Sequence, residues 1–343
     1  MEVMQTIVET EEKPLGVIES LQQGFTFLNH HLWLIALPII LDVFLWLGPR
    51  LSVSTLMDRF VGALFSQPDL PQEFATNFEI AAESLKGLGV NYNLLSLLAG
   101  PLTGLPSLFA RLDFRSLSSP HGGMIDLTSW QMVVMWLLIL IPVGILIGSF
   151  WLTHVVFSLR SERFLSRAFF SRWGWIWLNI NLYFIVLFVA IVLFSLLVGA
   201  VGAIFLLLFG TIGAALFSVL WVLFIGFSIW LSIGLYFVVT AISLDGVNLA
   251  SAVWRSLNVV GRNALSTLGF LTLALLLMEG FSRIWMQLSA QTWGVVLSII
   301  GNAYLGAAIV AASFLFYQSR YHYWQKARAL VILNQRSDQN NKS

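Results

Sequence analysis

The sequence predicts an all-α fold, a polytopic membrane protein with six transmembrane helices. The first reason is composition, since 58% of the 343 residues are hydrophobic and only 10% are charged, whereas soluble domains carry about 25% charged residues. The second is a set of long apolar stretches, each close to the ~20 residues that cross ~30 Å of hydrocarbon. The third is an amphipathic, helix-like segment before three of these stretches, at 20–33, 164–177 and 252–265.

Charge and cysteine content exclude several classes of function. The net charge is +1, which gives no reason to expect a nucleic acid as partner. The chain has no Cys, so disulfides and thiolate metal sites are excluded. Its first residues are acidic and polar, with no basic segment followed by an apolar core, so we expect no cleaved signal. We divide the chain into an acidic tail (1–19), a transmembrane domain (20–328) and a polar tail (329–343).

The expected spans follow the apolar stretches. The longest uncharged stretch, 176–244, is long enough for two or three crossings. Gly210 and Gly213 within it favour a tight turn between two helices. We place the six spans at 32–49, 130–158, 176–209, 212–244, 264–288 and 293–318.

The distribution of basic residues sets the expected orientation. Four arginines lie in segment 160–175, and the C-terminal tail is also basic. Lys and Arg near span ends favour the cytoplasmic side. Two crossings between 176 and 244 put both segments inside, whereas three would put the tail outside. We therefore expect both termini in the cytoplasm and the large loop, 50–129, outside.

The three amphipathic segments align on Phe25, Phe169 and Val259. Each has an apolar face, then polar residues at an expected kink, and then a span. This pattern predicts three repeated units, each an interfacial helix followed by a transmembrane hairpin. The alternative is that they are ordinary amphipathic connectors. We expect four basic residues of these segments to meet anionic headgroups, namely Arg167, Arg172, Arg255 and Arg262.

The last of these segments carries a family resemblance. SAVWRSLNVVGRNALSTLGFLTLALLL (251–277) resembles the helix-then-span element of a bacterial six-helix membrane domain, which is fused to some glycerophosphodiester phosphodiesterases and occurs in related uncharacterised families. The resemblance implies six helices over about residues 15–330 and a prokaryotic cytoplasmic membrane. The fused enzymes carry a separate soluble domain with His, Glu and Asp clusters. This sequence contains no such domain, so the phosphodiesterase activity does not carry over.

The 50–129 loop contains its own structural pattern. Two amphipathic stretches, 57–65 and 71–85, predict helices. Segment 94–112 is apolar but is broken by Gly100, Pro101, Gly104 and Pro106. We expect this segment to lie on the outer leaflet or dip into it. The loop is then either a cap on the helix ends or a lid over a lipid-facing groove.

A few polar residues lie inside the expected spans. Asp42 is about ten residues into the first span, Glu279 and Arg283 are spaced for an ion pair in the fifth, and Asn302 lies in the sixth. Intramembrane ionisable residues are costly and are usually paired. We expect these four residues to form one polar cluster. The cluster is either a transporter's site for a proton or ion, or a set of polar contacts that stabilises the helix bundle.

No enzyme signature is present. The sequence lacks HExxH, GxSxG and a P-loop, so we expect no catalysis, no cofactor and no metal. The expected function is to organise membrane lipids or other membrane proteins. The alternative is a transporter or permease component that uses the intramembrane acidic residues.

Overall fold

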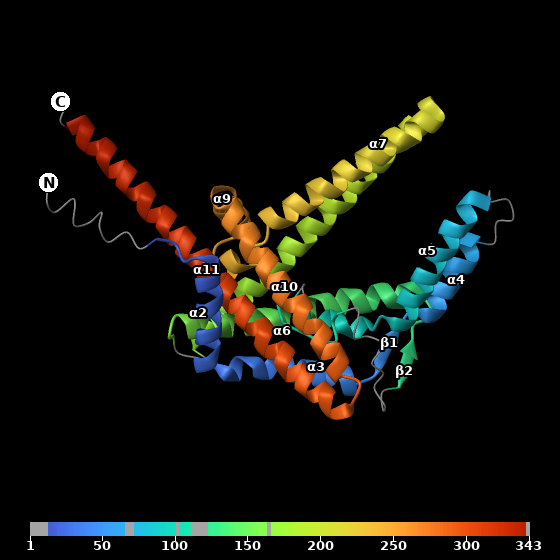
Figure 1. The fold of residues 1–343 in the computed structure, drawn as a ribbon, viewed down its shortest axis with the longest axis horizontal. Coiled ribbons are helices and arrows are strands. Elements are labelled where there is room, and N and C mark those ends of the chain that lie inside the picture. The colour runs from blue at the N-terminus through green and yellow to red at the C-terminus, as the bar shows by residue number, and fades with distance from the viewer. Residues whose placement is uncertain (1–12, 66–71, 101–102, 112–122, 163–165, 341–343) are drawn as a thin grey trace. The chain divides into compact units, whose positions relative to one another are not determined.

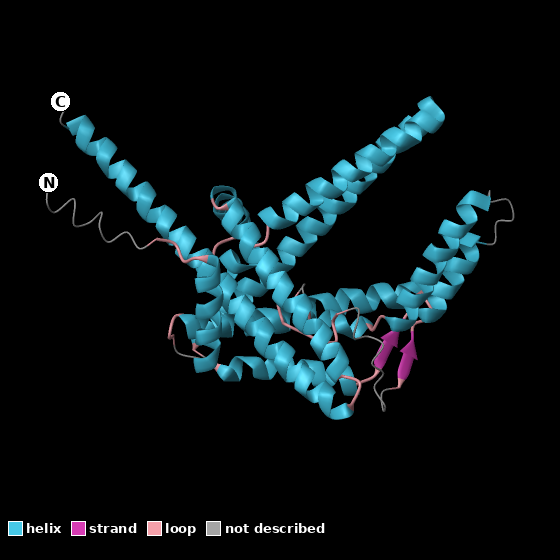
Figure 2. Cartoon of the chain, viewed as in Figure 1, coloured by secondary structure: helices cyan, strands magenta, loops and turns pink. Residues whose placement is uncertain are grey.

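The computed structural model describes residues 13–65, 72–100, 103–111, 123–162 and 166–340. Within these ranges the chain is all-α apart from two short strands (Figures 1 and 2). Most of the expected acidic tail and the first residues of segment 164–177 lie outside the described residues. The elements are α2 (Val17–His30), η1 (Leu32–Ile35), α3 (Ala36–Leu47), β1 (Arg50–Ser52), α4 (Ser54–Phe65), α5 (Gln72–Asn91), η2 (Leu94–Leu98), β2 (Met124–Asp126), α6 (Trp130–Leu159), α7 (Arg167–Gly234), α8 (Val238–Asp245), α9 (Leu249–Arg262), α10 (Ala264–Leu288) and α11 (Thr292–Asn340).

Several helices are long and apolar enough to cross a membrane. In the described residues there are four of them: α6, the stretch Arg167–Asp245, α10, and α11 as far as Ala329. A fifth is possible if α2 and Leu32–Leu47, which are bent by 94° at His31, count as one span. The chain therefore has the long apolar helices of a multi-pass membrane protein. The first expected span, 32–49, is too short to cross alone, because η1 and α3 together are only about 26 Å long.

Helix α7 folds back on itself at Gly210. That residue leaves helical geometry, with φ 52° and ψ −122°. A Cβ on Gly213 would lie 1.9 Å from the carbonyl oxygen of Phe205, so the chain turns there with no room for a side chain. The ring of Phe194 packs on that of Phe224, 5.2 Å between centroids, which joins the two arms side by side (Figure 1). The tight turn predicted at Gly210 and Gly213 is confirmed.

The threefold repeat is not confirmed. The chain leaves helical geometry at His31 after α2 and at Asn263 after α9. Helix α7, by contrast, continues without a break through Ser171 and Arg172, so the kink predicted there is wrong. Ser and Arg are tolerated inside helices, and sharp kinks require a stronger cause such as Pro or an interrupted hydrogen bond.

The expected single domain, 20–328, contains two compact units built from alternating segments of the chain. Unit 1 comprises Met1–Phe27, Phe170–Ala274 and Ile309–Ser343, and unit 2 comprises Leu28–Phe169 and Leu275–Ala308. In unit 1 the buried rings of Phe237 and Phe270 both pack on Phe316, at 5.6 and 4.7 Å between centroids. In unit 2 the fully buried Trp151 of α6 donates its indole N–H to the carbonyl oxygen of Leu34 at 2.8 Å. Helix α11 extends to Asn340, so the expected polar tail begins as helix.

The 50–129 loop of unit 2 has a folded core. Strand β1 pairs in parallel with β2, and α4 packs beside α5 (Figure 1). The side chain of Asn93 accepts the backbone N–H groups of Leu51 and Leu95, at 3.0 and 3.1 Å. Buried side chains of the loop join those of α6 in one apolar cluster: Leu51, Leu56, Leu94, Leu127, Val133 and Leu140. The loop is therefore packed on α6 through this cluster.

Candidate functional site

Asp42 is fully buried in α3, and its carboxylate binds a segment from the 50–129 loop. Ser107 Oγ donates to its Oδ1 at 2.5 Å. The backbone N–H of Leu108 donates to Oδ2 at 2.8 Å, and that of Phe109 to Oδ1 at 3.3 Å. Ser107 Oγ in turn accepts the N–H of Ala110 at 3.1 Å. One carboxylate thus fixes a turn of irregular backbone, Thr103–Arg111, which we call the inserted segment.

The inserted segment lies deep between helices of unit 2. A Cβ on Gly148 of α6 would be 1.9 Å from the carbonyl oxygen of Thr103, and one on Gly306 of α11 would be 2.2 Å from the Pro106 side chain. At ~1.5 Å per residue, these glycines are about 27 and 21 Å from the first residues of their helices. The segment therefore does not rest on the helix ends, as a surface cap would. Small residues on α6 and α11 let its backbone approach closely, as they do between membrane helices.

The inserted segment satisfies its backbone by local turns. Gly100 and Gly104 have φ of 93° and 72°, a region that Gly adopts without a steric penalty. Thr103 Oγ1 donates to the Gly100 carbonyl at 2.9 Å and accepts the N–H of Leu105 at 3.3 Å. Buried backbone polar groups must be paired, and irregular backbone at membrane depth is tolerated only where protein surrounds it or water reaches it. The same glycines that disfavour a helix here allow this compact turn.

Glu279 pairs with the inserted segment instead of with Arg283. Arg111 Nη2 lies 2.5 Å from Glu279 Oε1. Arg283 is exposed, and the structure contains no ion pair between it and Glu279. This arrangement corrects the expected Glu279–Arg283 pair. The physical reason is that Asp42 holds the segment so that Arg111, two residues beyond Phe109, reaches Glu279.

Asn302 is buried in α11, and its Nδ2 has no hydrogen-bond partner among the described residues. Among the residues that the structure describes, no hydrogen bond joins Asn302 to Asp42 or Glu279. The four residues expected to form one polar cluster therefore do not do so through hydrogen bonds or ion pairs. Sequence reasoning missed Ser107 and Arg111 as the partners. The available signal was an acid in an apolar span that needed donors, together with a turn-forming segment in the neighbouring loop.

Arg172, one of the four expected interfacial basic residues, caps a helix in unit 1. Its Nη2 donates to the carbonyl oxygens of Ser243 and Leu244, at 3.1 and 2.7 Å, at the C-terminal end of α8. A cation there interacts favourably with the helix dipole. Gly246 follows with φ 65°, and a Cβ on it would lie 1.7 Å from Arg172 Nη1. Arg172 is therefore a structural cap, not a free headgroup ligand.

Arg255 belongs to a second contact set in unit 1. Its Nη1 lies 2.6 Å from Asp245 Oδ2, which also accepts the hydroxyl of Tyr317 at 2.8 Å. The guanidinium of Arg255 lies 4.7 Å from the ring centre of Tyr321. Burial alone would lower the pKa of Arg255, but its hydrogen bond and charge interaction with Asp245 outweigh burial and raise the pKa above its ordinary value. Arg255 is thus permanently charged and paired within the protein.

The other two basic residues are exposed. Arg262 lies 5.1 Å from the ring centre of Trp324, and Arg167 is exposed at the start of α7. Headgroup contact remains a prediction for Arg167 and Arg262. No group of three or more His, Cys, Asp or Glu side chains suited to a metal ion occurs among the described residues. In comparisons with known proteins, no family model, no curated protein and no solved structure matches this chain.

Proposed function

We propose that this protein is a six-span protein of a prokaryotic cytoplasmic membrane that organises lipids or partner membrane proteins without catalysing a reaction. The observation that carries the proposal is the surface of α7. In the most apolar 18 residues of Arg167–Asp245, which contains α7, only 6% are buried, against 67% in the most apolar 18 residues of α11. Both arms present large apolar side chains, among them Leu207 and Val222, exposed at 85% and 68%. Contiguous apolar surface of this kind is a contact surface for lipid or for other proteins.

The length of the second α7 arm supports two crossings between 176 and 244. The second arm, from Gly210 to Gly234, is about 36 Å long. This matches a ~30 Å hydrocarbon layer with a modest tilt. With α6, α10, α11 and the bent α2–α3 pair, the two arms make six crossings. The even number places both termini on the same side, and the basic residues favour the cytoplasm.

Transport is the second candidate, and the inserted segment is the observation that favours it. Irregular backbone at membrane depth occurs where it lines a water-filled cavity or is surrounded by protein. The contacts of Asp42 favour a segment that is surrounded by protein over one that lines a water-filled cavity. Its two oxygens accept three donors from the segment, so the carboxylate is occupied by a structural task. We therefore rank lipid or partner organisation above transport.

Site-specific photo-crosslinking in living cells tests the proposed function. A photoreactive amino acid is placed at Leu207 or Val222 on α7, with Glu83 of α5 as an exposed control on the polar loop. We expect both α7 positions to crosslink to lipid or to a discrete partner protein, and Glu83 to do so far less. Equal, weak crosslinking at all three positions would refute the proposal, because the apolar surface would then have no specific contact.

A further inference from the structure

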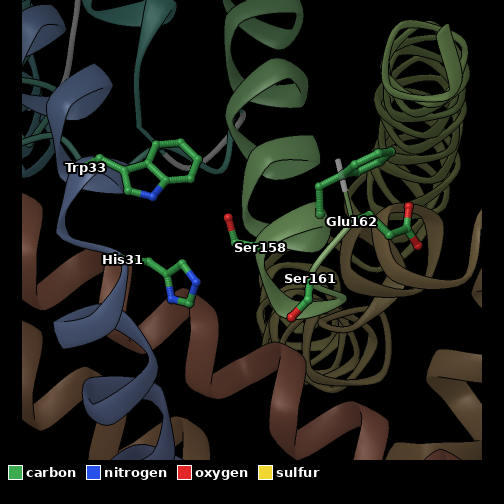
Figure 3. Close-up of a pocket in the computed structure, with 6 residues that line it drawn as sticks. His31, Trp33, Ser158, Ser161 and Glu162 are labelled. Carbon is green, nitrogen blue, oxygen red and sulfur yellow. The ribbon is translucent and has the colours of Figure 1, made fainter. Parts of the chain in front are cut away.

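Unit 2 contains an open pocket of about 510 Å³ at the end of α6. Its lining residues come from two sides (Figure 3). His31 lies at the break between α2 and η1 and Trp33 in η1, and the others belong to the last turn of α6 and the residues that follow: Phe157, Ser158, Ser161 and Glu162. The pocket thus combines two aromatic rings with hydroxyl, imidazole and carboxylate groups.

Contacts beneath the pocket fix its walls relative to each other. Trp151 of α6 holds η1 through the hydrogen bond to Leu34. The indole of Trp33 meets the ring of His154 edge-on, with 5.4 Å between centroids. His154 is itself held by a 2.9 Å hydrogen bond between its Nδ1 and the carbonyl oxygen of Phe150. A pocket whose walls are pre-positioned loses less entropy when it binds a ligand.

Ser161 has an unusual backbone for a residue with a side chain. Its φ is 53°. Its N–H donates to the Ser158 carbonyl at 3.3 Å, and the next N–H, of Glu162, donates to the Phe157 carbonyl at 3.0 Å. These two bonds form a Schellman motif with Ser161 in the left-handed position, where Gly is strongly preferred. Glycine would make the same turn without strain. Strained residues of this kind cluster at functional sites, and the Ser161 side chain lines the pocket.

The charges around the pocket suit a ligand that carries both signs. Glu162 supplies a carboxylate, and the C-terminal end of α6 adds partial negative charge, so a cation is favoured there. The face of the exposed Trp33 ring also attracts ammonium groups. The imidazole of His31 and the Ser161 hydroxyl provide donors of the kind that bind phosphate. Arg160 does not line the pocket and lies 3.7 Å from Glu162. The pocket lies at one end of an apolar helix of 30 residues, the position that a lipid headgroup takes beside a membrane span.

We propose that this pocket binds the headgroup of a zwitterionic phospholipid, in which a phosphate is linked to an alkylammonium group. The phosphate meets His31 and Ser161, and the ammonium meets Glu162 and the ring of Trp33. This inference rests on the proposed function, of which it specifies the lipid. Phosphatidylethanolamine and phosphatidylcholine share the recognised chemistry, and the experiment includes both.

The test uses the full-length protein, purified in detergent and stripped of lipid. Binding is measured as a rise in the unfolding temperature with ligand concentration. The probes are dihexanoyl phosphatidylethanolamine, phosphatidylcholine and phosphatidylglycerol, together with inorganic phosphate. We expect either or both of the zwitterionic lipids to bind more tightly than phosphatidylglycerol and phosphate. Equal binding of all four, or no binding, would overturn the proposal.

Two variants separate a ligand role from a structural role. Ser161→Gly should raise the unfolding temperature without lipid, because it removes the strain, and should weaken zwitterionic lipid binding roughly threefold to tenfold. Glu162→Gln should weaken the same binding by about tenfold or more and leave phosphatidylglycerol unaffected. Glu83→Gln, an exposed acid of α5 that does not line the pocket, should change neither quantity.

A Ser161→Gly protein that is more stable and binds lipid normally would overturn the role of the hydroxyl and with it the assignment of the pocket. The same conclusion follows if Glu162→Gln and Glu83→Gln behave alike. Crosslinking at Leu207 and Val222 reports on the α7 surface and does not involve the pocket. If those crosslinks form and headgroup selectivity is absent, the pocket assignment fails and the proposed function stands. If the crosslinks are absent, the proposed function itself fails.

Discussion

The carboxylate of Asp42 in α3 accepts the backbone N–H of Leu108, 66 residues later in the sequence, at 2.8 Å. Through this contact a single side chain supplies the hydrogen bond that a helix or sheet neighbour would otherwise give to the inserted segment. Backbone donors buried without a partner are costly. The acidic residue in the first apolar stretch is therefore explained by the packing of the 50–129 loop on the helices of unit 2.

This geometry predicts different costs for two substitutions of Asp42. In Asp42→Asn the amide oxygen can still accept from Leu108, and the Ser107 hydroxyl can rotate to accept from the amide nitrogen. The weaker bond from Phe109 is lost, so we expect a cost of about 1 kcal/mol. Asp42→Leu leaves all three donors unpaired, and at ~1–3 kcal/mol for each buried group the cost is at least about 3 kcal/mol. Thermal unfolding in detergent measures both values.

The same two variants distinguish structure from transport. If Asp42 only holds the inserted segment, the Asp42→Asn protein should still support the cellular function of the native protein. The Asp42→Leu protein should not support that function, because less of it should be folded. An Asn variant that folds and inserts normally and yet has no activity would indicate a proton or ion site. That result would place transport ahead of the organising function.

The close contact between α6 and the inserted segment predicts the effect of added methyl groups. A Cβ on Gly148 meets the backbone of Thr103 at 1.9 Å, and backbone atoms cannot move aside without displacing the segment. Gly148→Ala should therefore cost about 1–3 kcal/mol through overpacking. Gly280→Ala in α10 is the matched control, since a Cβ there meets nothing within 4 Å. It should be neutral or stabilise by up to ~1 kcal/mol. Equal effects in a thermal unfolding assay would show that the segment is not packed against α6.

Helix positions were predictable here to the extent that they depend on long apolar runs. The expected spans 130–158 and 264–288 correspond closely to α6 and α10, because ~20 consecutive apolar residues favour a helix wherever they pack, even with Pro142 inside α6. The turn at Gly210 was predictable because glycines within a long apolar stretch favour a tight turn. The missing break at Ser171 and Arg172 shows the limit, since polar residues at a helix position do not by themselves interrupt its hydrogen bonds.

Side-chain partners were not predictable in the same way. The pairing of Glu279 with Arg111 depends on where the inserted segment sits, which no local pattern records. Spacing along α10 favoured Arg283, because the rule for pairs four residues apart considers one helix alone. The left-handed Ser161 was equally hidden, since Ser gives no sequence signal for that conformation, as Gly would.

A double-mutant cycle should show that Glu279 is coupled to Arg111 and not to Arg283. The side chains of Arg111 and Glu279 are 20% and 59% exposed, so solvent weakens the pair, and we expect a coupling energy of up to ~1 kcal/mol. The cycle uses Arg111→Ala, Glu279→Ala and the double variant, read by unfolding temperature at low salt. A parallel cycle with Arg283→Ala should give a coupling near zero. A larger coupling to Arg283 would contradict the assigned pair.

The shared acceptor Asp245 predicts unequal effects on unit 1. Asp245→Ala removes the partner of both Arg255 and Tyr317 and leaves two partly buried donors unpaired. Tyr317→Phe removes one donor and leaves Asp245 its bond to Arg255, so it should cost only about 0.5–1.5 kcal/mol. We expect Asp245→Ala to cost roughly twice as much or more, measured by thermal unfolding. If Tyr317→Phe proves the more damaging change, then Asp245 is not the centre of this contact set.

Single-cysteine labelling can determine how many times residues 176–244 cross the membrane. The chain contains no Cys, so an impermeant thiol reagent has no background. Glu83→Cys in α5 precedes α7 and should be labelled in intact cells whichever count holds. With two crossings, Gln291→Cys, in the turn between α10 and α11, should also be labelled. Gly261→Cys in α9 should then react only after the cells are permeabilised. Three crossings would reverse the labelling of Gln291→Cys and Gly261→Cys and leave that of Glu83→Cys unchanged, because only the elements after α7 would change sides. We expect the two-crossing pattern, since the fold at Gly210 makes α7 a hairpin of two arms and its second arm spans about 36 Å.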